Sequence, residues 1–210
     1  MRILITAGPT REYLDPVRYI SNASSGRIGV ALAAAAKAQG HHVTLILGPT
    51  HLEPPEVDDL VRVTSAADMF EATVARFDGC EVFIAAAAVA DFRPVGREQH
   101  KIKKRPGRIS IELEATADIL GSMGRRRRRG QVLVGFCLET TDLERRARGK
   151  LEAKGLDLVV ANSADAIDAP RQDALILTPG GRTETLTQVT KEELADRVLA
   201  AAMAVKGARR

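Results

Sequence analysis

Arg2-Ile-Leu-Ile-Thr6 is the first apolar run; a long loop ending in Ser24-Ser-Gly26 leads to a helical pattern, Arg27 to Gln39, and a second run, His42-Val-Thr-Leu-Ile-Leu47. Short aliphatic and β-branched runs are typical of strands buried on both faces. Gly40 stands between the helical pattern and the second run, where a left-handed C-terminal cap is usually glycine. The stretch therefore predicts a βαβ unit, the building block of a parallel sheet.

The same alternation continues along the chain. Further strands are predicted at Leu60–Val63, Glu81–Ala88, Val132–Glu139 and Leu158–Ala161, and helices at Ala66–Phe77, Thr116–Met123, Asp142–Lys154 and Lys191–Val205. Because crossovers between parallel strands are right-handed, helices should cover both faces of one sheet. We expect an α/β, Rossmann-like, doubly wound and mostly parallel fold, with residues 1–210 forming a single domain.

Two segments interrupt the alternation. Residues 91–114 are rich in Lys and Arg and end in a predicted strand, Arg108 to Leu113. Long excursions of this kind often act as lids, and we place the lid at about residues 92–107. Leu175 to Gln188 carries Pro179-Gly-Gly181 between strand-like residues and predicts a C-terminal β-hairpin.

Composition narrows the class of protein. Of 210 residues, 45% are apolar and 28% charged, as in ordinary globular domains. The longest apolar run, Val82 to Ala90, is too short to cross a bilayer, and Met1-Arg2 leads into a strand without a signal-like region, so we expect a cytoplasmic protein. Cys80 and Cys137 lack metal-ligand spacing and are interpreted as buried small hydrophobes.

The net charge of +4 raises the possibility of an anionic partner. Much of it comes from Arg125 to Arg129, but aromatic residues are only 3% and tryptophan is absent, which leaves few stacking platforms for nucleic acid. We interpret the arginine run as a solvated connection, with nucleic-acid binding as the less favoured alternative.

The first loop carries the strongest signal for a ligand. Ser24, Ser25 and Gly26 directly precede the first helix, whose unpaired N–H groups and positive dipole end favour a phosphate. The hydroxyls of Ser21, Ser24 and Ser25 can donate to phosphate oxygens, although simple capping of the helix is the alternative.

The fourth strand and the predicted lid add a second group of candidates. The strand ends in Ala85-Ala-Ala-Ala88, and Asp91 follows shortly after. The small side chains let a base or sugar approach the backbone, and the Asp91 carboxylate can hold ribose hydroxyls. The alternative is that the alanines only allow close helix packing. Lys101-Ile-Lys-Lys104 lies in the lid, where three ammonium groups could neutralise a triphosphate; such clusters are more often solvated patches.

Two other classes of function compete with nucleotide-dependent catalysis. An NAD(P)-binding oxidoreductase would share the fold, but its GxGxxG pattern is missing, Leu47-Gly-Pro-Thr50 replaces the expected acidic residue, and Tyr13 and Tyr19 form no Tyr-xxx-Lys pair. A noncatalytic nucleotide- or nucleic-acid-binding protein is the second alternative.

Six segments in order resemble the phosphopantothenoylcysteine synthetases, the ligases that join 4'-phosphopantothenate to cysteine in coenzyme A biosynthesis. The matching segments are Ile5-Thr-Ala-Gly-Pro-Thr-Arg11, Asp15-Pro-Val-Arg-Tyr-Ile-Ser-Asn-Ala-Ser-Ser-Gly26, Ala86-Ala-Ala-Val-Ala-Asp91, Lys101-Ile-Lys-Lys104, Val134-Gly-Phe136 and Lys154-Gly-Leu-Asp-Leu-Val-Val-Ala-Asn162. The resemblance extends over nearly the whole chain.

The resemblance implies a reaction and the residues that carry it. Bacterial members use CTP with Mg²⁺ to form an acyl-cytidylate, which the amine of cysteine attacks to release CMP, whereas eukaryotic members favour ATP. Asn22 would polarise the acyl carbonyl and Lys101 would contact phosphates, the two catalytic assignments. The nucleotide contacts implied are Gly8, Ser24, Gly26, Ala86, Ala87, Asp91, Lys101, Lys104 and Phe136, and no protein metal cluster is expected because the nucleotide carries the ion.

The resemblance also implies a homodimer in which the hairpin Leu175 to Gln188 contributes to the contact. Many members are fused behind a flavin-dependent decarboxylase; because Arg2 begins the first strand, a separate decarboxylase is expected. The chain departs from the family pattern at Thr116-Ala-Asp-Ile119, at Ser163 and at Cys137-Leu138. These departures bear on base choice and dimer packing more than on the reaction.

Overall fold

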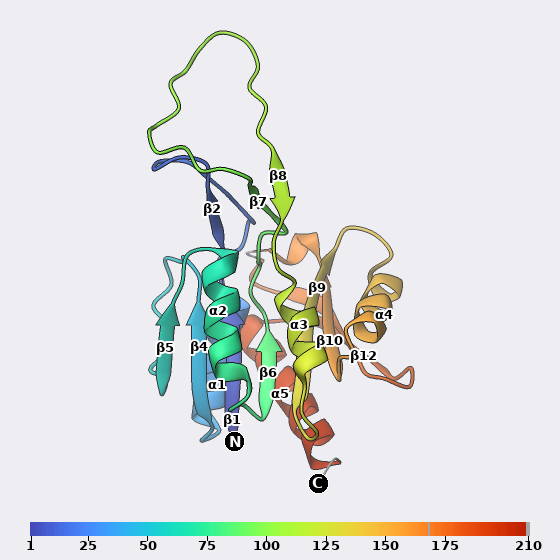
Figure 1. Ribbon diagram of the computed structural model, residues 1–210. Coiled ribbons are helices and arrows are strands. Elements are labelled where there is room, and N and C mark those ends of the chain that lie inside the picture. The colour runs from blue at the N-terminus through green and yellow to red at the C-terminus, as the bar shows by residue number, and fades with distance from the viewer. Residues whose placement is uncertain (168, 209–210) are drawn as a thin grey trace.

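An eight-stranded sheet forms the centre of the computed structural model, which describes residues 1–167 and 169–208. Its strands lie in the order β12-β11-β10-β9-β6-β1-β4-β5 (Figure 1). The strands are β1 Arg2–Ala7, β4 His42–Leu47, β5 Asp59–Arg62, β6 Val82–Ala85, β9 Val132–Glu139, β10 Leu158–Ser163, β11 Gln172–Leu177 and β12 Thr183–Val189. All neighbours from β5 to β10 pair in parallel, whereas β11 and β12 pair antiparallel. The prediction of a mostly parallel, Rossmann-like sheet is confirmed.

Helices cover both faces of the sheet, as expected for a doubly wound fold. Helices α1 (Arg27–Ala38) and α5 (Lys191–Gly207) pack on one face, and α2 (Ala66–Phe77), α3 (Ile119–Arg126) and α4 (Leu143–Ala153) on the other. A short 3-10 turn, η1 (Ala164–Ala166), follows β10. The alternation within β1 explains the two layers, because Ile3 and Ile5 face α1 and α5 while Leu4 faces the opposite cluster.

Two small ribbons project beyond the carboxyl ends of the strands. β2 (Arg11–Tyr13) pairs with β3 (Tyr19–Ser21) in the first loop, and β7 (Phe92–Pro94) pairs with β8 (Leu113–Ala115). Residues 95–112 continue from the second ribbon as a long excursion away from the body (Figure 1). The first ribbon was not predicted.

The structure corrects three predicted boundaries. The strand Arg108–Leu113 is wrong, because only Leu113 to Ala115 pairs with a neighbour. β6 ends at Ala85 rather than Ala88, since Ala88 makes only an isolated bridge with Pro9. α3 begins at Ile119, because the Asp118 carboxylate accepts the Gly121 N–H and so ends the preceding loop as an N-cap.

The C-terminal hairpin is present, formed by β11 and β12 around Thr178 to Arg182. Cys80 and Cys137 are buried free thiols, which confirms their interpretation. Among the residues that the structure describes, no helix combines the length and apolar character needed to cross a bilayer.

The arginine run is more structural than a solvated connection. Arg126 and Arg128 both pair with Asp78, at 3.3 and 3.2 Å. Arg127 donates to the buried Asp157 carboxylate at 3.0 Å, which also accepts the Leu133 N–H of β9. Much of the run therefore holds the α3–β9 connection to the body, and the solvated interpretation was incomplete.

A close approach between α1 and β1 gives the first testable prediction. A Cβ at Gly29 would lie 2.3 Å from the Cβ of Ala7, with backbone behind it. Gly29→Ala should therefore lower the free energy of unfolding by about 1–3 kcal/mol through overpacking. Gly149→Ala is the matched control, because a Cβ there meets nothing within 4 Å on α4 and should stabilise the helix by about 0.5–1 kcal/mol. Urea unfolding measures both; equal stability of the two variants would contradict the argument.

Candidate functional site

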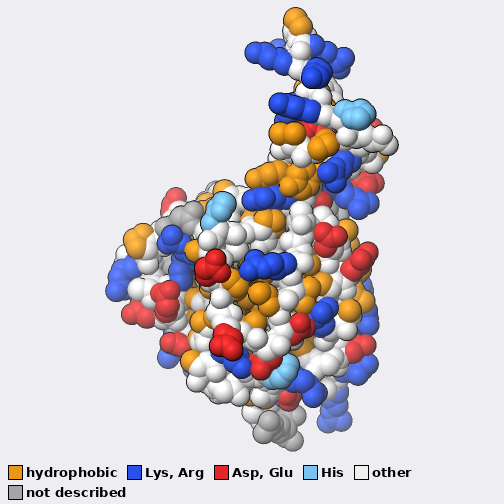
Figure 2. Space-filling view, turned by 90° about the vertical axis from the view of Figure 1, so that its left-hand side faces the viewer, with side chains coloured by type: hydrophobic (Ala, Val, Ile, Leu, Met, Phe, Trp, Pro, Cys, Tyr) orange, Lys and Arg blue, Asp and Glu red, His pale blue; other side chains and the backbone are white. Residues whose placement is uncertain are grey.

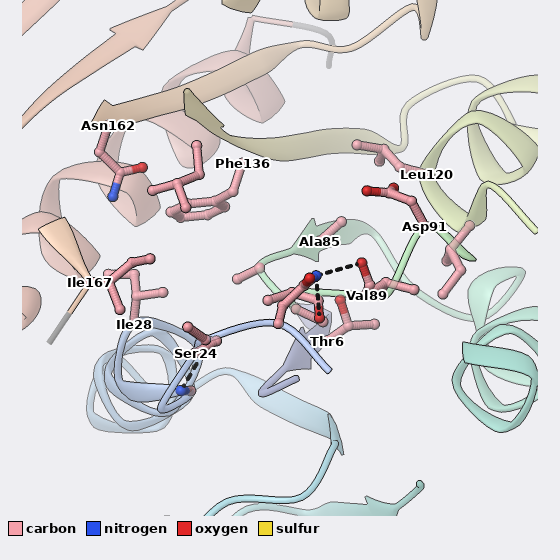
Figure 3. A pocket seen from close by; sticks show the side chains of 18 of the residues that line it. Thr6, Ser24, Ile28, Ala85, Val89, Asp91, Leu120, Phe136, Asn162 and Ile167 are labelled. Carbon is pink, nitrogen blue, oxygen red and sulfur yellow. Dashed lines mark hydrogen bonds between the residues drawn. The ribbon is translucent and has the colours of Figure 1, made fainter. Parts of the chain in front are cut away.

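A cavity of about 740 Å³ opens at the carboxyl ends of β6, β9 and β10 (Figure 3). Open α/β sheets place ligands at this edge, where the strand order reverses about the first strand. The sequence-predicted residues that line it are Asn22, Ser24, Gly26, Ala86, Ala87, Asp91 and Phe136. Segments more than a hundred residues apart in the chain are thus brought together around one space.

The start of α1 faces the cavity without a side-chain cap. Gly26 is the N-cap residue of α1 and has a φ of +82°. No side chain caps the helix at this position by a hydrogen bond. Ser24 Oγ instead accepts the Gly26 N–H at 3.3 Å (Figure 3). The simple capping alternative is therefore not what the structure has, and the first-turn N–H groups remain available to an anion.

Gly8 shapes the site from beneath rather than from its wall. A Cβ at Gly26 would lie 3.1 Å from the Gly8 Cα, and Gly8 itself has φ of +78°. Gly8 is buried, and its carbonyl accepts the Ala88 N–H at 2.9 Å. Its position supports the backbone of both cavity walls, and direct contact with a nucleotide stays a prediction.

Asn22 joins the first loop to the segment that follows β6. Its Nδ2 donates to the carbonyls of Ala88 at 3.2 Å and Val89 at 2.9 Å. Figure 3 marks the hydrogen bonds among the cavity residues that it draws as dashed lines. The side chain is exposed, so the amide stands at the surface of the cavity, although both of its N–H groups are engaged.

Two lysines and an aspartate near the α3–α4 side of the cavity were not assigned a role from the sequence. Lys150 Nζ donates to the Phe136 carbonyl at 2.5 Å, and Lys154 Nζ pairs with Asp118 at 2.8 Å. All three side chains line the cavity. The i, i+4 spacing of the lysines on a helix was the available signal, because such residues share one face.

The opposite end of the cavity is more apolar. Ile28, Phe136 and Ile167 lie there near Asn162 (Figure 3). Asn162 Nδ2 donates to Gln172 Oε1 at 3.4 Å, and Lys191 Nζ donates to that oxygen and to the Ala166 carbonyl. This network, which sequence reasoning also missed, holds η1 against the start of α5.

Lys101 and Lys104 do not line the cavity. Both are exposed on the excursion, which carries a concentration of basic side chains away from the body (Figure 2). Their contact with nucleotide phosphates requires the excursion to approach the cavity, and it stays a prediction.

Comparison with known proteins assigns the family. Residues 1–205 match the model of the DNA/pantothenate metabolism flavoprotein C-terminal domain. The chain belongs to this family.

Individual curated proteins are similar to about three quarters of this chain. The chain is 48% identical over 165 residues to the coenzyme A biosynthesis bifunctional protein CoaBC of Bacillus subtilis, covering 78% of this chain and 40% of that protein. It is 50% identical over 163 residues to a cysteine/cysteine sulfinic acid decarboxylase of an unknown prokaryotic organism, covering 77% of this chain and 45% of that protein. The chain thus spans less than half the length of these curated relatives.

A solved structure matches almost end to end. The crystal structure of the C-terminal domain of a coenzyme A biosynthesis bifunctional protein CoaBC has a TM-score of 0.83 and 39% identity to this chain. The match covers 98% of this chain and 96% of the solved one. The fold described above is therefore the fold of this flavoprotein C-terminal domain family.

Electrostatics in the flavoprotein C-terminal domain follow burial and pairing around the cavity. Burial lowers the pKa of Lys150, and the neighbouring Lys154 ammonium acts in the same direction. Burial raises the pKa of Cys137, which lies on the face of the sheet opposite Phe136. Within residues 1–167 and 169–208, no group of three or more His, Cys, Asp or Glu side chains could hold a metal ion.

Asp118 gives a prediction with a defined dependence on pH. Burial alone would raise its pKa, but the Lys154 ammonium and the Gly121 N–H outweigh burial and lower the pKa from its ordinary value of 3.8. The charged carboxylate therefore contributes stability above about pH 4, and this contribution is lost as pH falls through the lower, folded-state pKa.

Asp118→Asn keeps an N-cap side chain but removes the charge. The wild-type protein should be more stable than this variant at neutral pH, and the difference should shrink as the pH is lowered below about 4. Urea unfolding across this range measures it. A stability difference that stayed constant with pH would show that the Lys154 pair contributes nothing.

Proposed function

We propose that this chain is a phosphopantothenate-cysteine ligase of coenzyme A biosynthesis. The carboxylate of 4'-phosphopantothenate attacks the α-phosphorus of a nucleoside triphosphate, and pyrophosphate leaves. The amine of cysteine then attacks the acyl carbonyl of the acyl-nucleotide, an amide bond forms, and the nucleoside monophosphate leaves with the bonding electrons.

The observation that carries the proposal is that the matched motifs line one cavity. The uncapped start of α1, the Asn22 amide and the Ala86 to Asp91 segment meet there with cationic Lys154. A helix start and ammonium groups suit phosphates, and the Asn22 amide beside them suits a carbonyl that gains negative charge. Family membership over residues 1–205 supports the same reaction.

The nucleotide contacts that we propose are those implied by the family resemblance. Asp91 would hold the ribose, Phe136 and the Ala86-Ala87 backbone would bracket the base, and Ser24 with Gly26 would meet phosphate. CTP is the proposed nucleotide, with ATP as the alternative. Mg²⁺ would be bound mainly by phosphate oxygens, because the described side chains around the cavity offer single carboxylates rather than a cluster.

Asn22 is the proposed catalytic hydrogen-bond donor. Both of its N–H groups have backbone partners, so one of these bonds must be exchanged for a bond to the substrate. The bond from Nδ2 to the Ala88 carbonyl is the longer of its two, at 3.2 Å. An acyl carbonyl placed beside Ala88 would accept this N–H in exchange, while the 2.9 Å bond to Val89 keeps the side chain in place. The amide would then stabilise the oxyanion that forms when cysteine attacks.

The competing functions have less support. An NAD(P) enzyme would carry a ribose-binding carboxylate after the second strand of the unit. Here β4 is followed by Gly48-Pro49-Thr50, and Thr50 Oγ1 donates to the Ser25 carbonyl at 2.6 Å. A nucleic-acid-binding role was motivated by the arginine run, whose members Arg126 to Arg128 are paired with Asp78 and Asp157.

The test of the function is pyrophosphate release by the purified protein with 4'-phosphopantothenate, cysteine and Mg²⁺, using CTP and ATP in parallel. We expect release that depends on 4'-phosphopantothenate, and an amide product by mass spectrometry. Asn22→Ala should lower the rate of amide formation by about 10²–10³ while the acyl-nucleotide still forms. Exposed Thr187→Ala is the control. No consumption of either nucleotide would overturn the ligase proposal.

We also propose a homodimer, in which the excursion and first ribbon supply the contact. Large apolar side chains gather there at the base of the projection (Figure 2). They are Val17, Tyr19, Phe92, Val95, Ile109, Ile111 and Leu113. Residues 108–115 alternate polar and apolar side chains, yet only Leu113 to Ala115 is paired, so a second copy could extend the strand.

The C-terminal hairpin, which was predicted to contribute to the dimer, exposes less apolar surface than the excursion. Leu175, Ile176, Leu177, Leu186 and Val189 are buried or half-buried. The hairpin's part in the dimer and the cytoplasmic location stay predictions.

A charge placed on the apolar surface tests the dimer. Ile111→Glu should convert a dimer into monomers in sedimentation-velocity measurements at micromolar concentration, because it buries an unpaired carboxylate in the contact. Leu60→Glu is the matched control, since Leu60 is also an exposed apolar residue but lies on β5 at the far edge of the sheet. A wild-type protein that sediments as a monomer would rule the dimer out.

A further inference from the structure

The first loop and the excursion are joined by several contacts at the top of the molecule, where the two segments lie side by side (Figure 1). The Arg97 guanidinium lies over the Tyr13 ring at 5.0 Å, and the Glu98 N–H donates to the Leu14 carbonyl at 2.9 Å. These contacts bring the base of the excursion against the loop that also carries Asn22. They do not, by themselves, fix the lysine motif.

Ile102, within the Lys101 to Lys104 motif, has both of its backbone polar groups bound by the first loop. Its N–H donates to Asp15 Oδ2 at 3.1 Å, and its carbonyl accepts from the Arg18 guanidinium at 2.5 Å. Asp15 and Arg18 also pair with each other at 3.5 Å. The peptide groups on either side of Ile102 are therefore clamped between a carboxylate and a guanidinium.

We propose that Asp15 and Arg18 form a latch that positions Lys101 relative to Asn22. The inference rests on the proposed function only in that Lys101 acts on the nucleotide. Asp15 and Arg18 are positioning residues, because they bind the backbone beside Lys101 and neither lines the cavity. The latch makes the lysine motif and the Asn22 loop one mechanical unit.

The side chain of Asp15 accepts hydrogen bonds through both of its carboxylate oxygens. The carboxylate is fully buried, and its second oxygen, Oδ1, accepts the N–H groups of Val17 and Arg18 at 2.7 and 2.9 Å. Burial would raise the pKa of Asp15, but the three N–H donors and the Arg18 guanidinium outweigh burial and lower it. A carboxylate held in this way keeps an oxygen directed at Ile102.

An isosteric substitution removes the bond from Ile102 to Asp15 and keeps the bonds from the Val17 and Arg18 N–H groups. In Asp15→Asn, the amide oxygen can still accept from Val17 and Arg18, which leaves the NH₂ group opposite the Ile102 N–H, where two donors face each other. Asp58→Asn is the matched control. Asp58 also accepts a backbone N–H, from Val43 at 2.7 Å, but lies far from the excursion beside β4.

Limited proteolysis measures the latch independently of activity. Trypsin must bind an extended backbone to cut the Lys101–Ile102 bond, and both polar groups of Ile102 are engaged in the latch. Asp15→Asn should speed cleavage at this bond by about tenfold relative to the wild-type protein at the same trypsin concentration. The sites are read by mass spectrometry. Wild-type and Asp58→Asn proteins should cleave alike.

Kinetics separates positioning from a general loss of structure. In the ligase assay, Asp15→Asn should raise the KM for the nucleotide by about tenfold, and adding Lys101→Ala should cost little more, because the two changes act on one contact. Additive effects of the two substitutions, or unchanged cleavage at Lys101 in a folded Asp15→Asn protein, would overturn the latch. A wild-type protein without ligase activity would refute the proposed function, and the cleavage ratio would still decide the latch.

Discussion

The cavity depends on a contact between two backbones, that of Gly8 after β1 and that of Gly26 before α1. Both glycines have positive φ, and a Cβ on Gly26 would lie 3.1 Å from the Gly8 Cα. Only residues without a side chain allow this approach at low cost. Because the two segments touch, α1 starts directly above the carboxyl end of β1, and its unpaired N–H groups face the ligand space rather than solvent. The phosphate site of the proposed reaction follows from this packing.

The parallel sheet accounts for the rest of the site. β6, β9 and β10 run in the same direction as β1, so the residues that follow each strand collect at one edge. Asn22, from the first loop, is fastened to the segment after β6 by two hydrogen bonds, and Phe136 near the end of β9 is fastened to α4 through Lys150. Each wall is thus tied to another segment, and the cavity keeps its shape by bonds between walls rather than within them.

The sequence predicted the central elements because their signals were local. β1, β4 and β9 are mostly aliphatic runs, and Ser65, the N-cap of α2, forms a capping box with Asp68. Site residues within one motif, such as Ser24 and Gly26 or Ala86 and Ala87, were also found in the cavity.

What the sequence did not reveal depends on distance in the chain. Lys154 joins the site through Asp118, thirty-six residues away, and Gln172 on β11 joins Asn162 on β10, so neither pairing has a local pattern. The predicted strand Arg108–Leu113 has the right alternation, but a single chain supplies no neighbour for most of it. Helix α3 begins late because the Thr116 hydroxyl bonds to the Ala90 carbonyl and Asp118 serves as the cap. Periodicity alone does not distinguish these outcomes.

Two buried carboxylates of the first loop, Glu12 and Asp15, bind the loop to two other segments of the chain. Glu12 accepts the Ala66 N–H at the start of α2 at 2.8 Å, and Asp15 accepts the Ile102 N–H in the excursion. A buried carboxylate that loses its donor is costly, so the loop resists separation from either neighbour. If the excursion moved toward the cavity with the Ile102 contacts intact, the loop that carries Asn22 would have to move with it. If those contacts broke first, Asp15 would lose one of its three N–H donors. The excursion that holds Lys101 and the loop that holds Asn22 are therefore energetically coupled, and in the proposed reaction this coupling would link nucleotide binding to the placement of the Asn22 amide.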